Sequence, residues 1–80
     1  MKREDLPDAV ETALRAIGGT APVARVAEEI WKQHEKSLRS SGDLFYTWQY
    51  EMRWAAQRLR DAGRLAHVRV AGRPVWQLLK

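Results

Sequence analysis

The amino-acid sequence predicts a single α+β domain in which three helices precede a two-stranded β-hairpin. Apolar residues recur at intervals of three and four in three segments of the first 62 residues, which is the spacing of an amphipathic helix. After Gly63 the pattern changes to two short runs rich in β-branched and other apolar residues, with a glycine between them. A chain of 80 residues has room for one hydrophobic core, so residues 1–80 are expected to form one domain.

The first helix is expected at about residues 7–17. One apolar stripe runs along it through Leu6, Val10, Leu14 and Ile17. Pro7 suits the first turn of a helix, where its missing N–H group costs no hydrogen bond. Gly18 and Gly19 are expected to end the helix, because glycine readily adopts the left-handed conformation of a helix C-cap.

The second helix is expected at about residues 22–35, after a short extended link through Thr20 and Ala21. Pro22 opens this helix, and one face of it is apolar. The residues on that face are Val23, Val26, Ala27 and Ile30, with His34 at the end and Trp31 at the border. Residues 35–43 are polar and include a Ser-Gly pair, so they are predicted to form a loop.

The third helix is expected at about residues 47–62, with Gly63 as its C-cap signal. Its buried stripe is predicted to consist of Trp48, Met52, Ala55, Ala56, Leu59 and Ala62. At about 100° per residue, the opposite flank of this helix faces solvent. That flank contains Tyr50, Arg53, Trp54, Gln57, Arg60 and Asp61.

A β-hairpin is expected at about residues 65–79, with Gly72 in its turn. Pro74 has no N–H group to donate, so it should lie at the start or edge of its strand. Trp76 and Leu78 are expected to share one face of that strand. A hairpin directly after a third helix is the element order of a winged helix-turn-helix domain. The hairpin would close the apolar side of the helices, and its turn would project as a wing.

The net positive charge is concentrated in the second half of the chain. Residues 1–44 contain seven Lys or Arg and eight Asp or Glu, whereas residues 45–80 contain seven and two. The net charge of +4 therefore combines a first half at −1 with a second half at +5. Positive charge confined to one part of a fold is typical of a protein that binds a polyanion. The alternative interpretation is a solvated basic face that only keeps the protein soluble.

Double-stranded DNA is the partner that these side chains predict. Arginine can bind guanine through two hydrogen bonds, and glutamine can bind adenine in the same way. The candidate DNA-binding residues are Tyr50, Arg53, Trp54, Gln57 and Arg60 on the third helix, and Arg69 and Arg73 on the hairpin. The helix is expected in the major groove, with the basic wing on the backbone or in the minor groove. This expectation requires the arginines to lie on one side of the molecule, without neutralisation by Glu51 or Asp61.

The chain resembles the N-terminal winged-helix module of Mrr-type restriction proteins over about residues 7–79. The matching motifs are Arg53-Trp54-Ala55, the helix exit Leu59-x-x-Ala62-Gly63-x-Leu65, the last strand Gly72-x-x-Val75-Trp76-x-Leu78, and the first-helix ending Leu14-Arg15-Ala16-Ile17-Gly18-Gly19. The polar loop before the third helix also agrees. In that family the module precedes a nuclease domain, and the resemblance implies DNA binding. A nuclease of that type needs acidic residues and an acid-x-lysine pair on neighbouring strands to hold magnesium, and the predicted strands carry only basic charges. DNA cleavage is therefore not implied for this chain.

Other chemistry is not expected. The chain has no cysteine, which excludes disulfides, thiolate metal ligands and zinc fingers. His34 and His67 do not have the spacing of a metal site, and no metal or cofactor is expected. Glu11, Glu28 and Glu29 are interpreted as solvated charges on helix faces. No catalytic constellation is recognisable, so the protein is not expected to be an enzyme. No segment is apolar enough to span a bilayer and no secretory signal is recognisable, so a cytoplasmic location is expected.

A protein–protein interaction module is the alternative function. Tyr50 and Trp54 are four residues apart on the outer flank of the third helix, and aromatic side chains often anchor interfaces. The competing interpretation is that Trp54 packs against the first helix or the polar loop. A homodimer would also match palindromic DNA sites, although the sequence shows no clear dimer interface.

Overall fold

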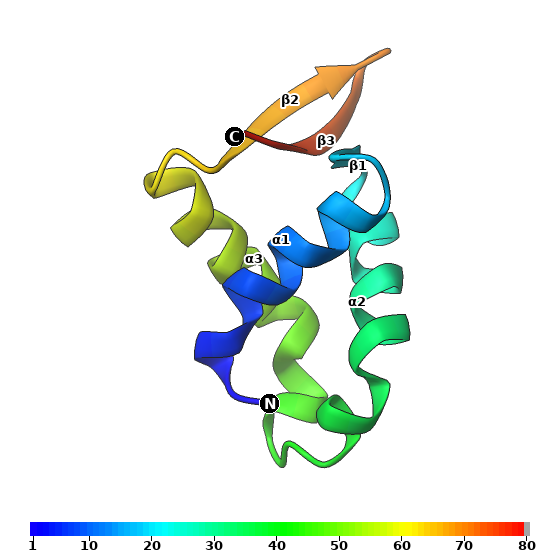
Figure 1. The fold of residues 1–80 in the computed structure, drawn as a ribbon, viewed down its shortest axis with the longest axis vertical. Helices are drawn as coiled ribbons and strands as arrows, with labels where there is room; N and C mark the ends of the chain where they lie inside the picture. The colour runs from blue at the N-terminus through cyan, green and yellow to red at the C-terminus, as the bar shows by residue number, and fades with distance from the viewer. Residues whose placement is uncertain (80) are drawn as a thin grey trace.

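Three helices and a three-stranded antiparallel sheet make up the structure, which is therefore α+β (Figure 1). The computed structural model describes residues 1–79. A short 3-10 turn, η1 (Arg3–Asp5), leads into the first helix. The further elements are α1 (Leu6–Ala16), β1 (Thr20–Ala21), α2 (Val23–Arg39), α3 (Leu44–Asp61), β2 (Leu65–Val70) and β3 (Arg73–Leu78).

Helix α1 follows the predicted pattern closely. Leu6, Val10 and Leu14 are fully buried on the predicted stripe, and Ile17 packs against the same core. The helix ends as expected, because Gly18 and Gly19 have φ angles of 102° and 91°, which other residues rarely adopt. These two glycines turn the chain into β1.

Helix α2 is longer than predicted, because it continues through Lys36, Ser37 and Leu38 to Arg39. The interpretation of residues 35–43 as a loop was therefore wrong for the first part of that segment. The helix bends at His34, whose φ and ψ of −128° and 19° are not helical, and Leu38 beyond the bend is fully buried. Burial of Leu38 could not be predicted from the sequence, because its neighbours are polar and show no apolar periodicity.

Helix α3 begins three residues before the predicted start, at Leu44. Its predicted core stripe is confirmed for the buried residues Trp48, Met52, Ala55, Ala56 and Leu59. Ala62, the last predicted member, is exposed and caps the helix. The ring of Trp48 stacks on Trp31 of α2, with centroids 6.1 Å apart, so aromatic contact joins these two helices.

The sheet has three strands in the order β1-β3-β2, whereas the sequence had predicted only the hairpin of two. Thr20 pairs with Gln77 and Ala21 pairs with Trp76, so the expected extended link between α1 and α2 is a short strand. The Leu78 N–H group donates a hydrogen bond of 2.7 Å to the Gly19 carbonyl beside this strand. These bonds attach the hairpin to the helical part of the chain.

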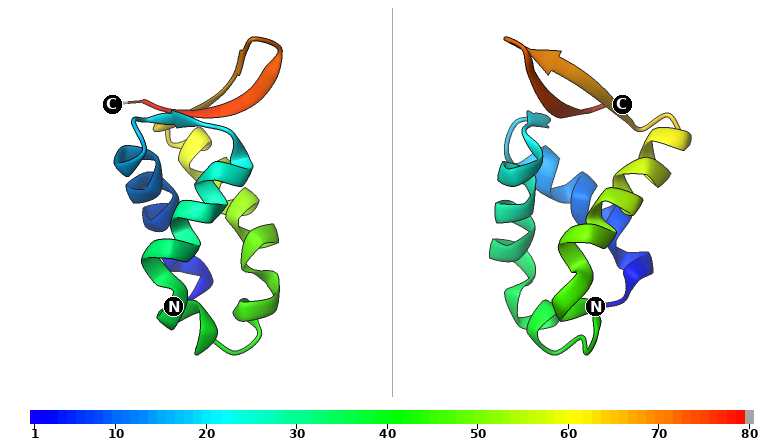
Figure 2. Two further views of the ribbon diagram at one scale, coloured as in Figure 1. Left: turned by 90° about the vertical axis from the view of Figure 1, so that its right-hand side faces the viewer. Right: turned by 180° about the vertical axis from the view of Figure 1, so that it is seen from behind.

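The predicted hairpin is confirmed, with β2 and β3 paired from Leu65 opposite Leu78 to Val70 opposite Arg73. His67 lies opposite Trp76, and their rings are nearly parallel. The side chain of Trp76 is buried in the core together with residues of all three helices. One end of the helical bundle is therefore covered by the sheet, while the β2–β3 turn extends beyond it (Figure 2).

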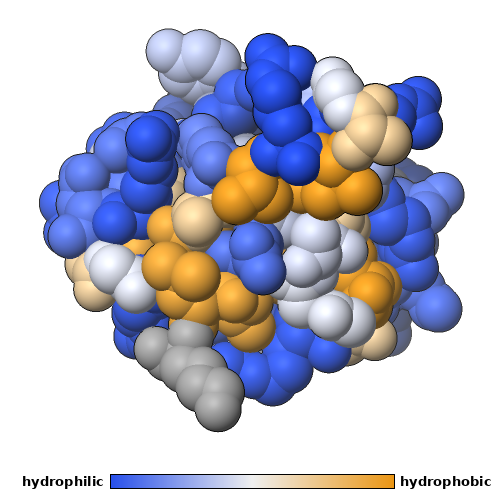
Figure 3. All heavy atoms as spheres, turned by 90° about the horizontal axis from the view of Figure 1, so that it is seen from above, coloured by the Kyte–Doolittle hydropathy of each residue, from blue (hydrophilic) through white to orange (hydrophobic). Residues whose placement is uncertain are grey.

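The end of the molecule formed by the sheet has a mixed surface. Viewed from above, apolar side chains lie near its centre and hydrophilic side chains surround them (Figure 3). Val70 and Leu79 are the larger apolar residues exposed in this part of the chain. Among residues 1–79, no helix is both long and apolar enough to cross a membrane.

Candidate nucleic-acid interface

Four of the predicted site residues lie along one exposed side of α3. Tyr50, Arg53, Gln57 and Arg60 are spaced by three or four residues and all are exposed to solvent. This spacing places them on successive turns of one helix face. The opposite face of α3 contributes its apolar stripe to the core, which fixes the orientation of the exposed side.

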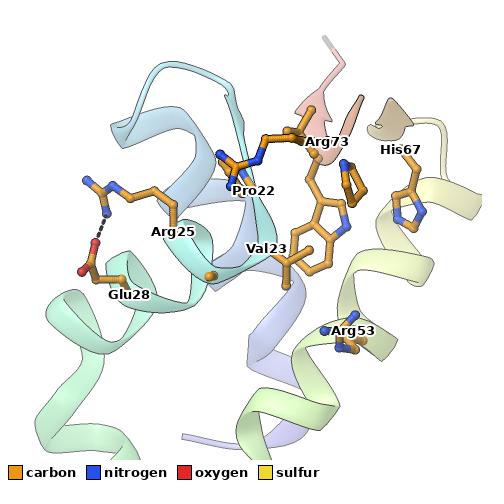
Figure 4. Close-up of a pocket in the computed structure, with 11 residues that line it drawn as sticks. Pro22, Val23, Arg25, Glu28, Arg53, His67 and Arg73 are labelled. Carbon is orange, nitrogen blue, oxygen red and sulfur yellow. Dashed lines mark ion pairs between the residues drawn. The ribbon is translucent and has the colours of Figure 1, made fainter. Parts of the chain in front are cut away.

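The hairpin brings its own basic residue to the same side of the molecule. Arg53 of α3, Arg73 of β3 and His67 of β2 line one pocket of about 750 Å³ (Figure 4). The Nη1 atom of Arg60 lies 3.4 Å from Nδ1 of His67, so the C-terminal part of α3 also borders this region. We call the surface formed by Arg53, Arg60, His67 and Arg73 the arginine saddle.

Arg69 extends the saddle to the tip of the hairpin. Its Nη1 atom donates a hydrogen bond of 3.0 Å to the carbonyl oxygen of Gly72, within the turn. Arg69 and Arg73 therefore both lie at the projecting end of the hairpin. A guanidinium group has five N–H donors, so Arg69 keeps further donors for a ligand after making this bond.

Ion pairs engage five of the six arginines that lie outside the saddle and Arg69, and Arg58 is the exception among residues 1–79. Arg3 pairs with Glu51, Arg15 and Arg64 pair with Glu11, Arg25 pairs with Glu28 and Glu29, and Arg39 pairs with Glu35. Within the described part of the chain, residues 1–79, no carboxylate forms an ion pair with a saddle arginine or with Arg69. Asp61, which could have neutralised the saddle, instead accepts a hydrogen bond of 2.9 Å from Gln57.

Trp54 does not join the other site residues. It is partly buried against the core, and the guanidinium carbon of Arg3 lies 3.8 Å from the centroid of its ring. Arg58 approaches the same ring at 5.7 Å. Trp54 therefore faces the N-terminal segment and stabilises its contact with α3, whereas Tyr50 remains 76% exposed.

Two of the three glutamates interpreted as solvated charges are buried. Glu11 is only 6% exposed, and its Oε1 atom accepts a hydrogen bond of 2.8 Å from Arg64. Glu29 is buried on α2, where the Gln33 amide donates to it at 3.0 Å. That hydrogen bond, with further help from Arg25 and Lys32, holds the pKa of the Glu29 carboxyl below its ordinary value against the opposite effect of burial. The expectation of a solvated charge is confirmed only for Glu28.

The structure adds residues to the site that the sequence had not assigned. One wall of the pocket that Arg53 and Arg73 line is formed by Pro22, which precedes α2 as its N-cap residue, and by Val23 and Arg25 of its first turn. These residues lie about thirty to fifty positions from Arg53 and Arg73 in the sequence, so only the folded chain brings them together. Their identity carried no separate signal, because Pro22 and Val23 already suited the start of a helix.

His67 has an altered protonation equilibrium at the edge of the saddle. Its ring centroid lies 6.1 Å from that of Trp76, and the two planes are inclined by only 15°. Partial desolvation of the ring, followed in importance by the positive charge of Arg60, lowers the pKa of His67 from its ordinary value of 6.5. The neutral ring is therefore favoured at neutral pH.

The saddle offers guanidinium N–H donors and no ion-paired carboxylate among residues 1–79. Across residues 1–79, no three His, Asp or Glu side chains lie close enough to hold a metal ion.

Comparisons with protein-family models, with curated proteins and with solved structures found no match to this chain.

Proposed function

We propose that this chain is a winged-helix domain that binds double-stranded DNA and catalyses no reaction. Helix α3 would enter the major groove, and the β2–β3 turn would contact the backbone or the neighbouring minor groove. The element order of three helices and a closing hairpin supports this assignment of the fold. The resemblance to the DNA-binding module of Mrr-type restriction proteins points to the same function.

The distribution of ion pairs is the main observation in favour of the proposal. Arg53, Arg60 and Arg73 lack carboxylate partners among residues 1–79, whereas five of the six arginines outside the saddle and Arg69 are paired, Arg58 being the exception. Unpaired guanidinium groups gathered on one side repel one another, and a bound polyanion would remove that repulsion. The saddle therefore has the charge of a phosphate-binding surface, while the rest of the surface is largely balanced.

Gln57 and Tyr50 give the proposed interface its base-reading groups. Both are exposed on the same side of α3 as Arg53. Arg53 can donate two hydrogen bonds to guanine, Gln57 can bind adenine, and the Tyr50 ring can contact the methyl group of thymine. The major groove is about 12 Å wide, which admits a helix with its side chains.

A salt titration with matched arginine variants tests the proposal. For the native protein, the logarithm of duplex affinity should fall linearly with the logarithm of salt concentration, with a slope of about −0.9 per phosphate contact. Arg73→Ala should weaken binding to all sequences and reduce the magnitude of the slope by about one. Arg53→Ala should cost about 1–3 kcal/mol of binding and relax base preference. Fluorescence polarisation of a labelled duplex measures all of these quantities.

Arg58→Ala is the control, because Arg58 lies on α3 but contacts Trp54 on the other flank. It removes the same charge from the same helix and should leave both affinity and slope nearly unchanged. Equal effects of Arg53→Ala and Arg58→Ala would mean that only net charge matters. A slope near zero for the native protein would contradict DNA binding through this surface.

Protein binding is the second candidate, because aromatic residues are exposed at the other end of α3. Tyr46 and Tyr50 are 83% and 76% exposed. Beside them, Trp31, Phe45 and Trp48 line a groove of about 530 Å³ between α2 and α3. Since Trp54 is turned away, this surface replaces the Tyr50/Trp54 pair that the sequence had suggested. Sedimentation velocity over a range of concentrations would reveal self-association, which a Tyr46→Ser, Tyr50→Ser double variant should abolish.

A further inference from the structure

The pocket within the saddle has two kinds of wall. Its charged and polar wall consists of Arg53 of α3, Arg73 of β3 and Arg25 of α2. His67 and Glu28 line it too, and the Glu28 carboxylate is paired with Arg25. Between the arginines, Val23 and Pro74 provide an apolar floor, to which the largely buried Trp76 adds little exposed surface. Its volume of about 750 Å³ lies within the range of about 300–1,000 Å³ that is typical of small-molecule sites. A ligand that matches this lining has both an apolar flat part and negative charge.

The three arginines that line the pocket differ in whether they are already paired with a carboxylate. Arg25 is already bound to Glu28 at 3.3 Å and to Glu29 at 3.2 Å, as Figure 4 shows for the first pair. The two arginines without a carboxylate in the described chain, Arg53 and Arg73, lie on different sides of Val23 in Figure 4. Negative groups are therefore expected at two points with an apolar surface between them. One nucleotide of a DNA strand has this form, because a phosphate lies on each side of its sugar and base.

A phosphate of a regular duplex would not use the apolar floor. Backbone phosphates require only cationic or N–H donors, whereas the base of a paired nucleotide is stacked inside the duplex. Only a nucleotide that has left the stack can place its ring against Val23 and Pro74. Extrusion of a base costs least where the base has no pairing partner, because only stacking then opposes it, whereas both pairing and stacking oppose the extrusion of a paired base.

We propose that this pocket accepts one unpaired nucleotide of the bound DNA, with its base on the floor formed by Val23 and Pro74 and its flanking phosphates at Arg53 and Arg73. This inference rests on the proposed DNA-binding function and adds a preference to it. The protein should bind a duplex that contains a single unpaired nucleotide more tightly than a fully paired duplex of the same length.

Three duplexes separate base binding from other causes. The first is fully paired, the second carries one extra unpaired nucleotide, and the third carries an abasic residue at that extra position. The second should bind at least about tenfold more tightly than the first, as contact with one unstacked base permits. The third duplex should lose this gain in affinity. It keeps the extra backbone phosphate and the bend that an extra nucleotide introduces, but it lacks the base. Equal binding of the second and third duplexes would mean recognition of bent DNA and would overturn the inference.

Ala24→Leu tests the pocket without changing charge. Ala24 lines the pocket and is exposed on α2, where leucine is a good helix former. This variant should bind the paired duplex with the native salt slope, yet lose the preference for the unpaired nucleotide. Ala16→Leu, at an exposed alanine of α1, makes the same chemical change elsewhere and should keep the preference.

The possible failures are distinguishable. If the native protein binds the paired and the bulged duplex equally, with a normal salt slope, this inference is wrong and the proposed function stands. If it binds neither duplex, both proposals fail. If Ala24→Leu retains the preference while circular dichroism shows the native fold, the base must bind outside this pocket, and the inference is again wrong.

Discussion

At the scale of single residues, Glu11 shows how a buried charge can tie segments together. Its carboxylate lies on α1, while Arg64, which donates to it, lies just before β2. A buried carboxylate without a donor is costly, because it loses its water and gains nothing in return. The pair therefore fixes the exit of α3 against α1 and helps to orient the hairpin.

Arg64→Ala should reduce the free energy of unfolding by about 1–3 kcal/mol, because it leaves the buried Glu11 acceptor without its main donor. Arg15→Ala is the control, since Arg15 also approaches Glu11 but only at 3.9 Å and from an exposed position. Arg15→Ala should lower the free energy of unfolding by no more than about 0.5 kcal/mol, as for other exposed ion pairs on a helix. Urea unfolding followed by circular dichroism measures both values, and equal losses would contradict the assigned role of Arg64.

His67 should make stability depend on pH. Because its pKa is lowered in the folded protein, the unfolded chain binds more protons around pH 6.5. The free energy of unfolding should therefore fall as pH decreases below about 6.5, and this contribution should level off below the folded pKa. In His67→Gln this part of the pH dependence should be missing, whereas His34→Gln should retain it. Thermal unfolding at several pH values between about 5 and 7.5 tests this, and parallel profiles for native protein and His67→Gln would refute it.

At the scale of elements, the sequence was most informative where one face of a helix repeats regularly. The stripes of α1 and α3 predicted their buried residues, such as Leu14 and Met52, because hydrophobic periodicity directly reflects burial. The end of α2 was missed for a physical reason. Leu38 is one apolar residue among polar neighbours, and the helix is continued there by the Glu35–Arg39 ion pair and by the burial of Leu38 itself.

The hairpin turn offers a prediction of its own. Ala71 and Gly72 both have positive φ, at 54° and 80°, which corresponds to the turn type that prefers Asn-Gly. Alanine in this conformation is strained, whereas asparagine tolerates it better. Ala71→Asn should therefore raise the free energy of unfolding by about 0.5–1 kcal/mol, measured by urea unfolding.

Ala62→Asn is the matched control for the turn. Ala62 is also an exposed alanine next to a glycine, but its φ is −85°. Relief of left-handed strain cannot occur there, so the stability should not increase. A similar gain in both variants would show that the effect does not arise from the turn conformation.

At the scale of the whole molecule, the arrangement of charge could be predicted only in part. The excess of arginine in the second half of the chain suggested a basic surface, and the element order suggested that α3 and the hairpin would share it. Which arginines form ion pairs with carboxylates depends partly on contacts between distant residues, such as Arg3 with Glu51. The wall that α2 adds to the saddle depends on the same long-range packing. Strand β1 was not predicted, because two residues are too few to show the alternation of apolar and polar side chains that indicates a strand.

The whole domain should unfold as one unit, since the sheet and the helices share a core. Trp76 lies on β3 but is buried with Leu14, Ile30 and Leu59 of the three helices. Trp76→Ala should cost about 3–5 kcal/mol, a large part of the roughly 5–15 kcal/mol that stabilises a small domain. The helical circular dichroism signal should then be lost at a much lower urea concentration. Val70→Ala, at a 53% exposed position of the same hairpin, should change the midpoint little. An unchanged helical midpoint in Trp76→Ala would mean that the hairpin is an independent appendage, and the saddle between it and α3 would then lack a fixed geometry.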